Sequence, residues 1–170
     1  MKRLSASAGA AALIALSSTP AAAVSPATQA TATAKIFKPL TISSVQSLDF
    51  GTIVLVGGSF TNEVVSMNQA GTVSCGSNPG VVLTCSGAPL PAKYKLVGTN
   101  NAVVTINCPP FNLTGPSTLA FTPNAPTTVN LGANGTTTGV TFSIGGSITV
   151  ASTTQDGTYT GTFAVTADYQ

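Results

Sequence analysis

Three cysteines are the residues of this 170-residue chain whose type and spacing most readily support chemistry. Cys75 and Cys85 flank the turn-forming segment Gly76–Gly80, and Cys108 lies further along the chain. If the flanking segments are adjacent antiparallel strands, their Cα atoms approach to about 4.5–5.5 Å, a separation that a disulfide tolerates. We therefore predict a disulfide between Cys75 and Cys85 and a free thiol at Cys108. The alternative pairing joins Cys85 to Cys108.

The sequence around Cys108 does not favour a nucleophilic thiol. A catalytic cysteine needs a neighbouring base or cation that lowers its pKa, and the chain contains no histidine. The neighbours Val104, Ile106 and Pro109 instead indicate that Cys108 serves as a small apolar side chain in the interior.

The acidic residues are too few and too dispersed to predict acid–base catalysis or metal binding. None has the spacing of a calcium loop, and no two lie close enough in sequence to suggest a catalytic pair. Histidine, the commonest general base and metal ligand, is absent. We therefore expect no catalytic residue, no metal and no cofactor, and we predict that the protein is not an enzyme. The four carboxylates are Asp49, Glu63, Asp156 and Asp168, which we assign to strand starts, a turn and the polar face of the last strand.

Residues 1–23 have the pattern of a secretory signal peptide. The basic start Met1–Arg3 is followed by the apolar run Ala8–Leu16, and Ala21–Ala23 provides the small residues of a cleavage site. The apolar run is far shorter than the roughly 20 residues that span a bilayer. We predict cleavage after Ala23, with Ala30 as the second choice. The mature chain is then exported to the periplasm, the cell surface or the medium, and it has no integral membrane span.

Charged residues are scarce, and the predicted mature chain is neutral. Removing Lys2 and Arg3 leaves four of the six basic residues against four acidic ones, so the balance is 4 − 4 = 0. Only 6% of residues are charged, whereas a typical soluble domain has about 25%. This excludes nucleic acid and anionic lipid as partners, because both attract basic surfaces. A surface rich in Thr, Ser and Asn fits an exported protein packed against neighbours, and equally a monomeric secreted one.

The C-terminal residues carry the clearest strand pattern. Apolar and polar residues alternate from Tyr159 to Tyr169, which is typical of a strand with one buried face. We predict that this is the longest strand and that it ends at the C-terminus. Its core-facing residues are Tyr159, Phe163, Val165, Ala167 and Tyr169.

Shorter apolar segments separated by turn residues precede the last strand. We predict two hairpins, one around Gly98–Asn101 and one around Gly145–Gly146, because Gly and Asn tolerate the positive φ of tight turns. Strands every eight to twelve residues predict an all-β, antiparallel, immunoglobulin-like sandwich of nine or ten strands, in which two sheets hide their apolar faces. Residues 24–34 form a flexible N-terminal segment in this prediction, and residues 35–170 form a single domain.

Several segments carry a family resemblance. They are Leu40–Ile42, Leu48–Ile53 with its D-F-G sequence, Pro91–Gly98, and Asp156–Tyr169 with its G-x-Y-x-G-x-F-x-V sequence. Together they resemble a bacterial family of unknown function, the one numbered 4402, whose members resemble fimbrial subunits. The resemblance covers nearly the whole mature chain, although Cys108 stands where an aliphatic residue is expected.

The resemblance implies a pilin-like sandwich of the chaperone–usher kind, with no catalytic residues. Its partners would be other copies or other surface subunits, with a periplasmic chaperone and an usher. Such a subunit can lack a strand, which a neighbour supplies at an exposed sheet edge. The candidate donor is Thr31–Phe37, whose alternation places Ala32, Ala34 and Ile36 on one side. The same segment can instead form the first strand of its own domain.

Two functions follow from these observations. The first is a non-enzymatic, fimbria-like structural subunit of the cell surface that assembles by strand addition. The second is a self-contained secreted binding module, an adhesin or glycan-binding protein, in which Tyr94 between Lys93 and Lys95 is the candidate contact. The remaining aromatic residues of the alternating segments are expected in the core: Phe121, Phe142, Phe163 and Tyr169.

Overall fold

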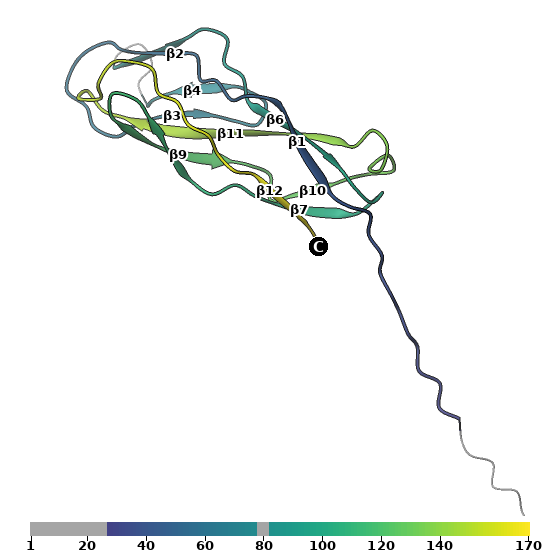
Figure 1. Ribbon diagram of the computed structural model, residues 1–170. Coiled ribbons are helices and arrows are strands. Elements are labelled where there is room, and N and C mark those ends of the chain that lie inside the picture. The colour runs from purple at the N-terminus through teal and green to yellow at the C-terminus, as the bar shows by residue number, and fades with distance from the viewer. Residues whose placement is uncertain (1–26, 78–81) are drawn as a thin grey trace, which may run out of the picture. The chain divides into compact units, whose positions relative to one another are not determined.

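The computed structural model describes residues 27–77 and 82–170, and this part of the chain is all-β (Figure 1). The predicted signal peptide of residues 1–23 and the Pro79–Gly80 turn lie outside the described residues. Contacts divide the chain into two units, residues 1–35 and residues 36–170. Residues 27–35 of the first unit form neither helix nor strand. All strands described below belong to the second unit.

The described part of residues 36–170 contains twelve strands, more than the nine or ten predicted, and every pairing is antiparallel. They are β1 (Thr41–Gln46), β2 (Thr52–Leu55), β3 (Glu63–Met67), β4 (Val73–Cys75), β5 (Leu83–Ser86), β6 (Ala92–Val97), β7 (Val103–Asn107), β8 (Phe111–Thr114), β9 (Thr118–Asn124), β10 (Thr128–Asn130), β11 (Val140–Val150) and β12 (Thr166–Tyr169).

The strands form one large and two small sheets. The large sheet has the order β1-β6-β11-β3-β4, and β9 also pairs with β11 and with β8. The small sheets are β10-β7-β12 and β2-β5. Each strand of the large sheet contributes buried or half-buried apolar side chains to two apolar clusters, and the small sheets supply apolar side chains to the same clusters. The result is the sandwich-like arrangement that one-sided alternation predicted.

Two apolar clusters fill the interior, and β11 contributes to both. Leu48 also packs against both clusters, so it lies where they meet. The first cluster consists of Phe50, Val65, Met67, Leu83, Leu119, Phe121, Ile148 and Val150. The second cluster consists of Ala92, Leu96, Val104, Ile106, Val129, Leu131, Phe142 and Ile144.

The predicted hairpin at Gly145–Gly146 is wrong, because β11 runs through both glycines without turning. Its first half pairs with β6, and its second half pairs with β3 and β9. A Cβ atom on Gly146 would overlap the ring of Phe121, and one on Gly145 would overlap the carbonyl oxygen of Met67. The glycines therefore permit close packing against the strand rather than a turn.

The predicted hairpin around Gly98–Asn101 is also wrong. β6 lies in the large sheet and β7 in a small one, so the two strands do not pair. Asn101 does adopt a positive φ of 57°, and its N–H donates to the carbonyl oxygen of Gly132 at 2.7 Å. The turn residues reverse the chain, but they carry it from one layer to the other. Leu96 and Val104 consequently face the second cluster from opposite sheets.

The last strand is much shorter than predicted, because only β12 pairs with β7. The predicted side-chain alternation nevertheless extends over the whole segment. Residues 161–165 have no strand partner among the described residues, so a continuous strand over 159–169 is a wrong prediction. The predicted inward residues are all half-buried: Tyr159, Phe163, Val165, Ala167 and Tyr169.

The segment ahead of β1 is not the first strand of the sandwich. β1 begins at Thr41, and Ala32, Ala34 and Ile36 lie in no strand. Ile36 is 88% exposed. Since two of the three candidate anchors are alanines, pairing within the domain would bury little apolar surface.

Candidate functional site

An apolar groove of about 810 Å³ opens on the flank of the first cluster. Two continuous runs of backbone line it, residues 48–55 on one side and residues 154–161 on the other. Between them lie buried side chains from the large sheet, namely Leu119, Phe121, Ile148 and Val150.

The groove exists because the layer that covers the first cluster is incomplete. β2 and β5 cover one part of the cluster, and the C-terminal segment covers another. In the described ranges, β2 pairs only with β5, and Thr160 pairs only with Thr114. Each side of the groove therefore has a backbone edge without a strand partner. Unpaired edges of this kind are templates for adding another strand.

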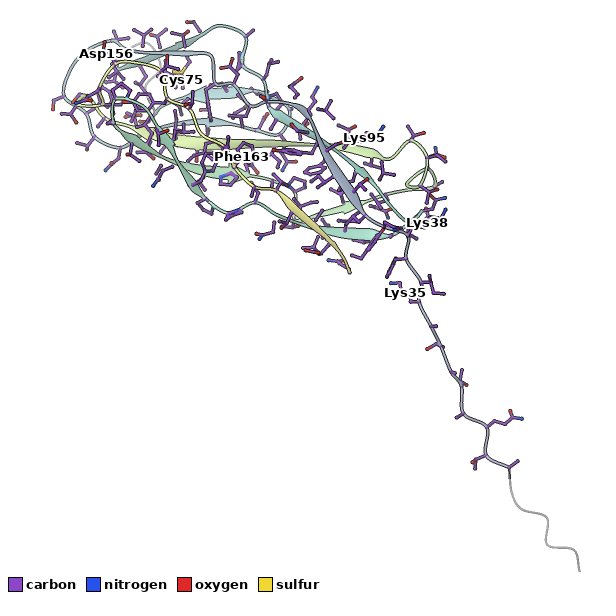
Figure 2. The ribbon with its side chains drawn as sticks, viewed as in Figure 1. Lys35, Lys38, Cys75, Lys95, Asp156 and Phe163 are labelled. Carbon is purple, nitrogen blue, oxygen red and sulfur yellow. A yellow bond between two sulfur atoms is a disulfide. The ribbon has the colours of Figure 1, made fainter. Side chains whose placement is uncertain are left out.

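Side chains, rather than a strand ladder, fasten the C-terminal side of the groove. The hydroxyl of Tyr159 donates to the carbonyl oxygen of Gln155 at 2.7 Å and forms a second hydrogen bond with the Ser117 hydroxyl at 2.8 Å. The ring of Phe163 (Figure 2) stacks on that of Phe111 with centroids 5.2 Å apart. These contacts hold the segment over the first cluster while its backbone stays unpaired over residues 161–165.

The disulfide between Cys75 and Cys85 is present as predicted, with Cα atoms 5.8 Å apart. The strands that carry it are not neighbours in a hairpin, contrary to the prediction. β4 pairs with β3 and β5 pairs with β2, so the bond joins the large sheet to the two-stranded sheet. It thereby fastens β2, one side of the groove, to the opposite layer.

Glu63 makes contacts that sequence analysis missed. The backbone N–H and the hydroxyl of Ser77 donate to its carboxylate at 2.7 and 2.8 Å. These hydrogen bonds hold the pKa of Glu63 below its ordinary value, and the backbone hydrogen bond has the larger effect. The two residues are 14 positions apart, so no local pattern signals the contact. Of the other carboxylates, Asp168 is exposed on β12, and Asp49 accepts a hydrogen bond from the Gly51 N–H at 2.8 Å.

Cys108 is a free thiol, as predicted, and packs half-buried against the second cluster. Burial raises its pKa. The thiolate, which is the reactive form, is therefore disfavoured.

Tyr94 is half-buried and packs against the second cluster. Its ring stacks on that of Phe142 with centroids 5.8 Å apart and meets that of Phe163 edge-on at 6.3 Å. Burial, followed by the nearby Cys108 thiol, raises the pKa of Tyr94. A ring packed in this way is not the exposed platform on which sugars stack. Phe121 and Phe142 are buried as expected, and Phe163 and Tyr169 are half-buried.

The chain ahead of β1 is held at Lys38 by a clamp of three residues. The Tyr169 hydroxyl donates to the Lys38 carbonyl oxygen at 2.8 Å and accepts the Thr99 N–H at 2.7 Å. The Lys38 N–H donates to the Thr99 hydroxyl at 2.7 Å. The ring of Phe37 stacks on Tyr169 with centroids 4.4 Å apart. We call Lys38, Thr99 and Tyr169 the clamp.

Over residues 27–77 and 82–170, no three metal-ligating side chains gather in an arrangement that could hold an ion. In the same ranges, no helix has the length and apolar character needed to cross a bilayer.

The fold and the groove define an all-β, antiparallel, sandwich-like domain with one disulfide between its layers. The chain belongs to the family described as Domain of unknown function (DUF4402), whose sequence model matches residues 40–169. This confirms the family to which the sequence segments pointed. No curated protein and no solved structure matches the chain. Two of the segments that carried the resemblance, Leu48–Ile53 and Asp156–Tyr169, contribute residues to the two sides of the groove.

Proposed function

We propose that the protein is a non-enzymatic structural subunit that is exported to the periplasm or cell surface and assembles by strand addition. The observation that carries this proposal is the groove, an apolar floor between two backbone edges that lack strand partners. An extended segment laid along it would gain main-chain hydrogen bonds, and alternate side chains would enter the first cluster.

The shape of the lining favours a peptide strand over a small molecule. Small-molecule pockets are concave sites with a few convergent polar groups. Here both walls are consecutive residues, 48–55 and 154–161. A peptide strand fits between two walls of backbone, because it presents backbone donors and acceptors on both of its edges.

Three further features support export and a surface role. The first 23 residues have the pattern of a signal peptide. The Cys75–Cys85 disulfide fits an oxidising compartment. The family resemblance to fimbrial subunits suggests other subunits as partners, with a chaperone and an usher that handle the open groove before assembly. The alternative of a glycan-binding module has less support, because the ring of Tyr94, its candidate contact, stacks on Phe142.

Photo-crosslinking in the native bacterial cells tests strand addition. Ile53 lines the groove, whereas Val64 on β3 is 46% exposed and is not a lining residue. A photoreactive phenylalanine analogue at position 53 is expected to form a covalent adduct with a surface or periplasmic protein, and the same analogue at position 64 is not. No adduct at position 53, or equal adducts at both positions, would overturn the proposal.

A further inference from the structure

We infer that the outer face of β1, β6 and β11 binds an anionic polysaccharide, a chain whose sugars carry carboxylates. Lys93 and Lys95 supply the positive charge, and hydroxyl side chains beside them supply hydrogen bonds. This site lies apart from the groove, so it gives the protein a second activity that does not depend on strand addition.

The two lysines lie side by side on the outer face of β6. The side chains of Ala92, Tyr94 and Leu96 contribute to the second cluster in the interior. Alternation along a strand therefore places Lys93 and Lys95 on the opposite, outer face, about 7 Å apart along the strand. Both are half-buried, as expected of lysines whose aliphatic stems lie along the sheet while the ammonium groups stay in water.

Hydroxyl side chains flank the lysines on the neighbouring strands. Lys95 is paired with Ser43 of β1 on one side and with Thr141 of β11 on the other. Lys93 is paired with Ser143 of β11. Residues directly opposite each other on antiparallel strands share a face, with Cβ atoms about 4.5–5.5 Å apart. These side chains therefore form one continuous patch, which we call the lysine face.

The lysine face has positive charge and no compensating carboxylate. β1, β6 and β11 contain no acidic residue. Within residues 27–77 and 82–170, no side chain of the lysine face forms a hydrogen bond or an ion pair with the rest of the chain. The ammonium groups and hydroxyls are therefore available to a ligand, and the uncompensated charge selects an anionic one.

The residue types of the lysine face favour a charged sugar chain over a protein or a membrane. Protein interfaces centre on buried aromatic or arginine anchors, and this face consists of lysine, serine and threonine only. The same lack of an aromatic platform disfavours a neutral sugar chain. An anionic membrane is recognised by clusters of about four to eight basic residues. A carboxylated sugar chain instead offers carboxylates to the ammonium groups and its own hydroxyls to the Ser and Thr side chains.

The lysine face does not overlap the groove. None of its residues lines the groove. Figure 2 shows Lys95 in the half of the domain that carries Lys38, far from Asp156 at the groove. A copy whose groove is filled would therefore still present the lysine face. In an assembly of many copies, the repeated faces would bind one long sugar chain with increased avidity.

Binding of the purified protein to immobilised polygalacturonate, a chain of carboxylated sugars, tests the inference. Methyl-esterified polygalacturonate is the matched neutral probe, because it has the same backbone without the charge. Biolayer interferometry measures the dissociation constant for each probe at low and at physiological salt. Vesicles of phosphatidylglycerol are the probe for an anionic membrane.

Two double variants with equal loss of charge isolate the lysine face. Lys93→Gln with Lys95→Gln removes its ammonium groups. Lys35→Gln with Lys38→Gln removes the same charge ahead of β1, and the clamp survives because it holds Lys38 through backbone atoms. Thr141→Val removes one hydroxyl from the face, and Thr149→Val is its control at an exposed position further along β11. Circular dichroism verifies that each variant is folded.

We expect the wild type to bind polygalacturonate more tightly than the methyl ester, and to bind it less tightly at physiological salt because salt screens exposed charges. The variant of Lys93 and Lys95 should bind about tenfold more weakly, whereas the variant of Lys35 and Lys38 should match the wild type. Thr141→Val should bind about two- to fivefold more weakly, and Thr149→Val should not.

Three outcomes would overturn the inference. The first is no binding to polygalacturonate, or equal binding to polygalacturonate and its methyl ester. The second is an equal loss of binding in the two double lysine variants, which would show that only the net charge of the protein matters. The third is binding to phosphatidylglycerol vesicles without binding to polygalacturonate, which would assign the lysine face to a membrane instead.

Discussion

The hydroxyl of Tyr169 donates a hydrogen bond of 2.8 Å to the carbonyl oxygen of Lys38, which lies 131 residues earlier in the chain. The same hydroxyl accepts the N–H of Thr99, so one oxygen atom joins the last strand, the segment ahead of β1 and the loop after β6. The position at which the N-terminal segment leaves the sandwich is thereby determined by a C-terminal side chain.

Tyr169→Phe should release the residues ahead of β1. It removes two hydrogen bonds and leaves the Thr99 N–H without its partner, and we expect a loss of about 1–3 kcal/mol in the free energy of unfolding. Hydrogen exchange should accelerate at Lys38 and Thr99. Tyr159→Phe is the matched control, since its hydroxyl bonds Gln155 and Ser117 at the groove. Unchanged exchange at Thr99 in Tyr169→Phe, or the same acceleration there in both variants, would contradict the clamp.

Replacing both Cys75 and Cys85 by serine should lower the free energy of unfolding by about 2–3 kcal/mol, because the bond closes a loop with a sequence separation of 10. Urea denaturation of the oxidised protein measures the loss. The Cys108→Ser variant keeps the disulfide and is expected to lose less. If the Cys108 variant loses as much as the double variant, the cross-link between the layers is not the stabilising feature.

Gly146→Ala should destabilise the fold. The added Cβ overlaps the ring of Phe121, which is 1% exposed and has no room to move. Overpacking of this kind costs about 1–3 kcal/mol. Thr149→Ala, an exposed site on the same strand, is the comparison in thermal denaturation. A Gly146 variant as stable as Thr149→Ala would mean that the ring does not lie against the strand.

Glu63 should make stability depend on pH in the acid range. The Ser77 hydrogen bonds lower its folded pKa, so its contribution is fully present above the unfolded value of about 4.3 and is lost as the pH falls through the folded pKa. The stability difference between wild type and Glu63→Gln should therefore shrink below about pH 4.3. Ser77→Ala keeps the backbone hydrogen bond, which has the larger effect on the pKa of Glu63. This variant should therefore retain most of the dependence of stability on pH. A difference that stays constant down to pH 2 would refute this account.

The Cys108 thiol should react slowly with iodoacetamide in the folded protein. Burial raises its pKa, so the reactive thiolate is scarcer at pH 8 than in an exposed cysteine. Mass spectrometry of alkylated peptides at successive times measures the rate. When urea unfolds the chain, the alkylation rate of Cys108 should rise to the rate of a short cysteine peptide. Equal rates in the folded and unfolded protein would place the thiol on the surface.

Local patterns in the sequence predicted what depends on neighbouring residues. The alternation from Tyr159 to Tyr169 gave the inward faces, and the spacing of Cys75 and Cys85 gave the disulfide. The pairing partners were not predictable in this way. The Gly145–Gly146 sequence is typical of a turn. Only the ring of Phe121, more than twenty positions away, explains why position 146 has no room for a side chain.

The groove could not be predicted from local patterns, because its two walls are about a hundred residues apart in the chain. Alternation indicates which face of a strand is buried, but it does not say whether each edge has a partner. The short length of β12 could not be predicted from the sequence for the same reason. The sequence of residues 161–165 suits a strand, and only the absence of a neighbour in the described structure leaves it unpaired.

The place of β11 along the chain has a consequence for timing. Both apolar clusters require this strand, and it is complete only when residue 150 has been made. Neither half of the sandwich can close earlier, because each would lack a central strand. A chain that emerges from its N-terminus therefore stays open until synthesis is nearly finished. If the proposed export threads the chain through a membrane in unfolded form, this delay keeps the polypeptide in a transportable state.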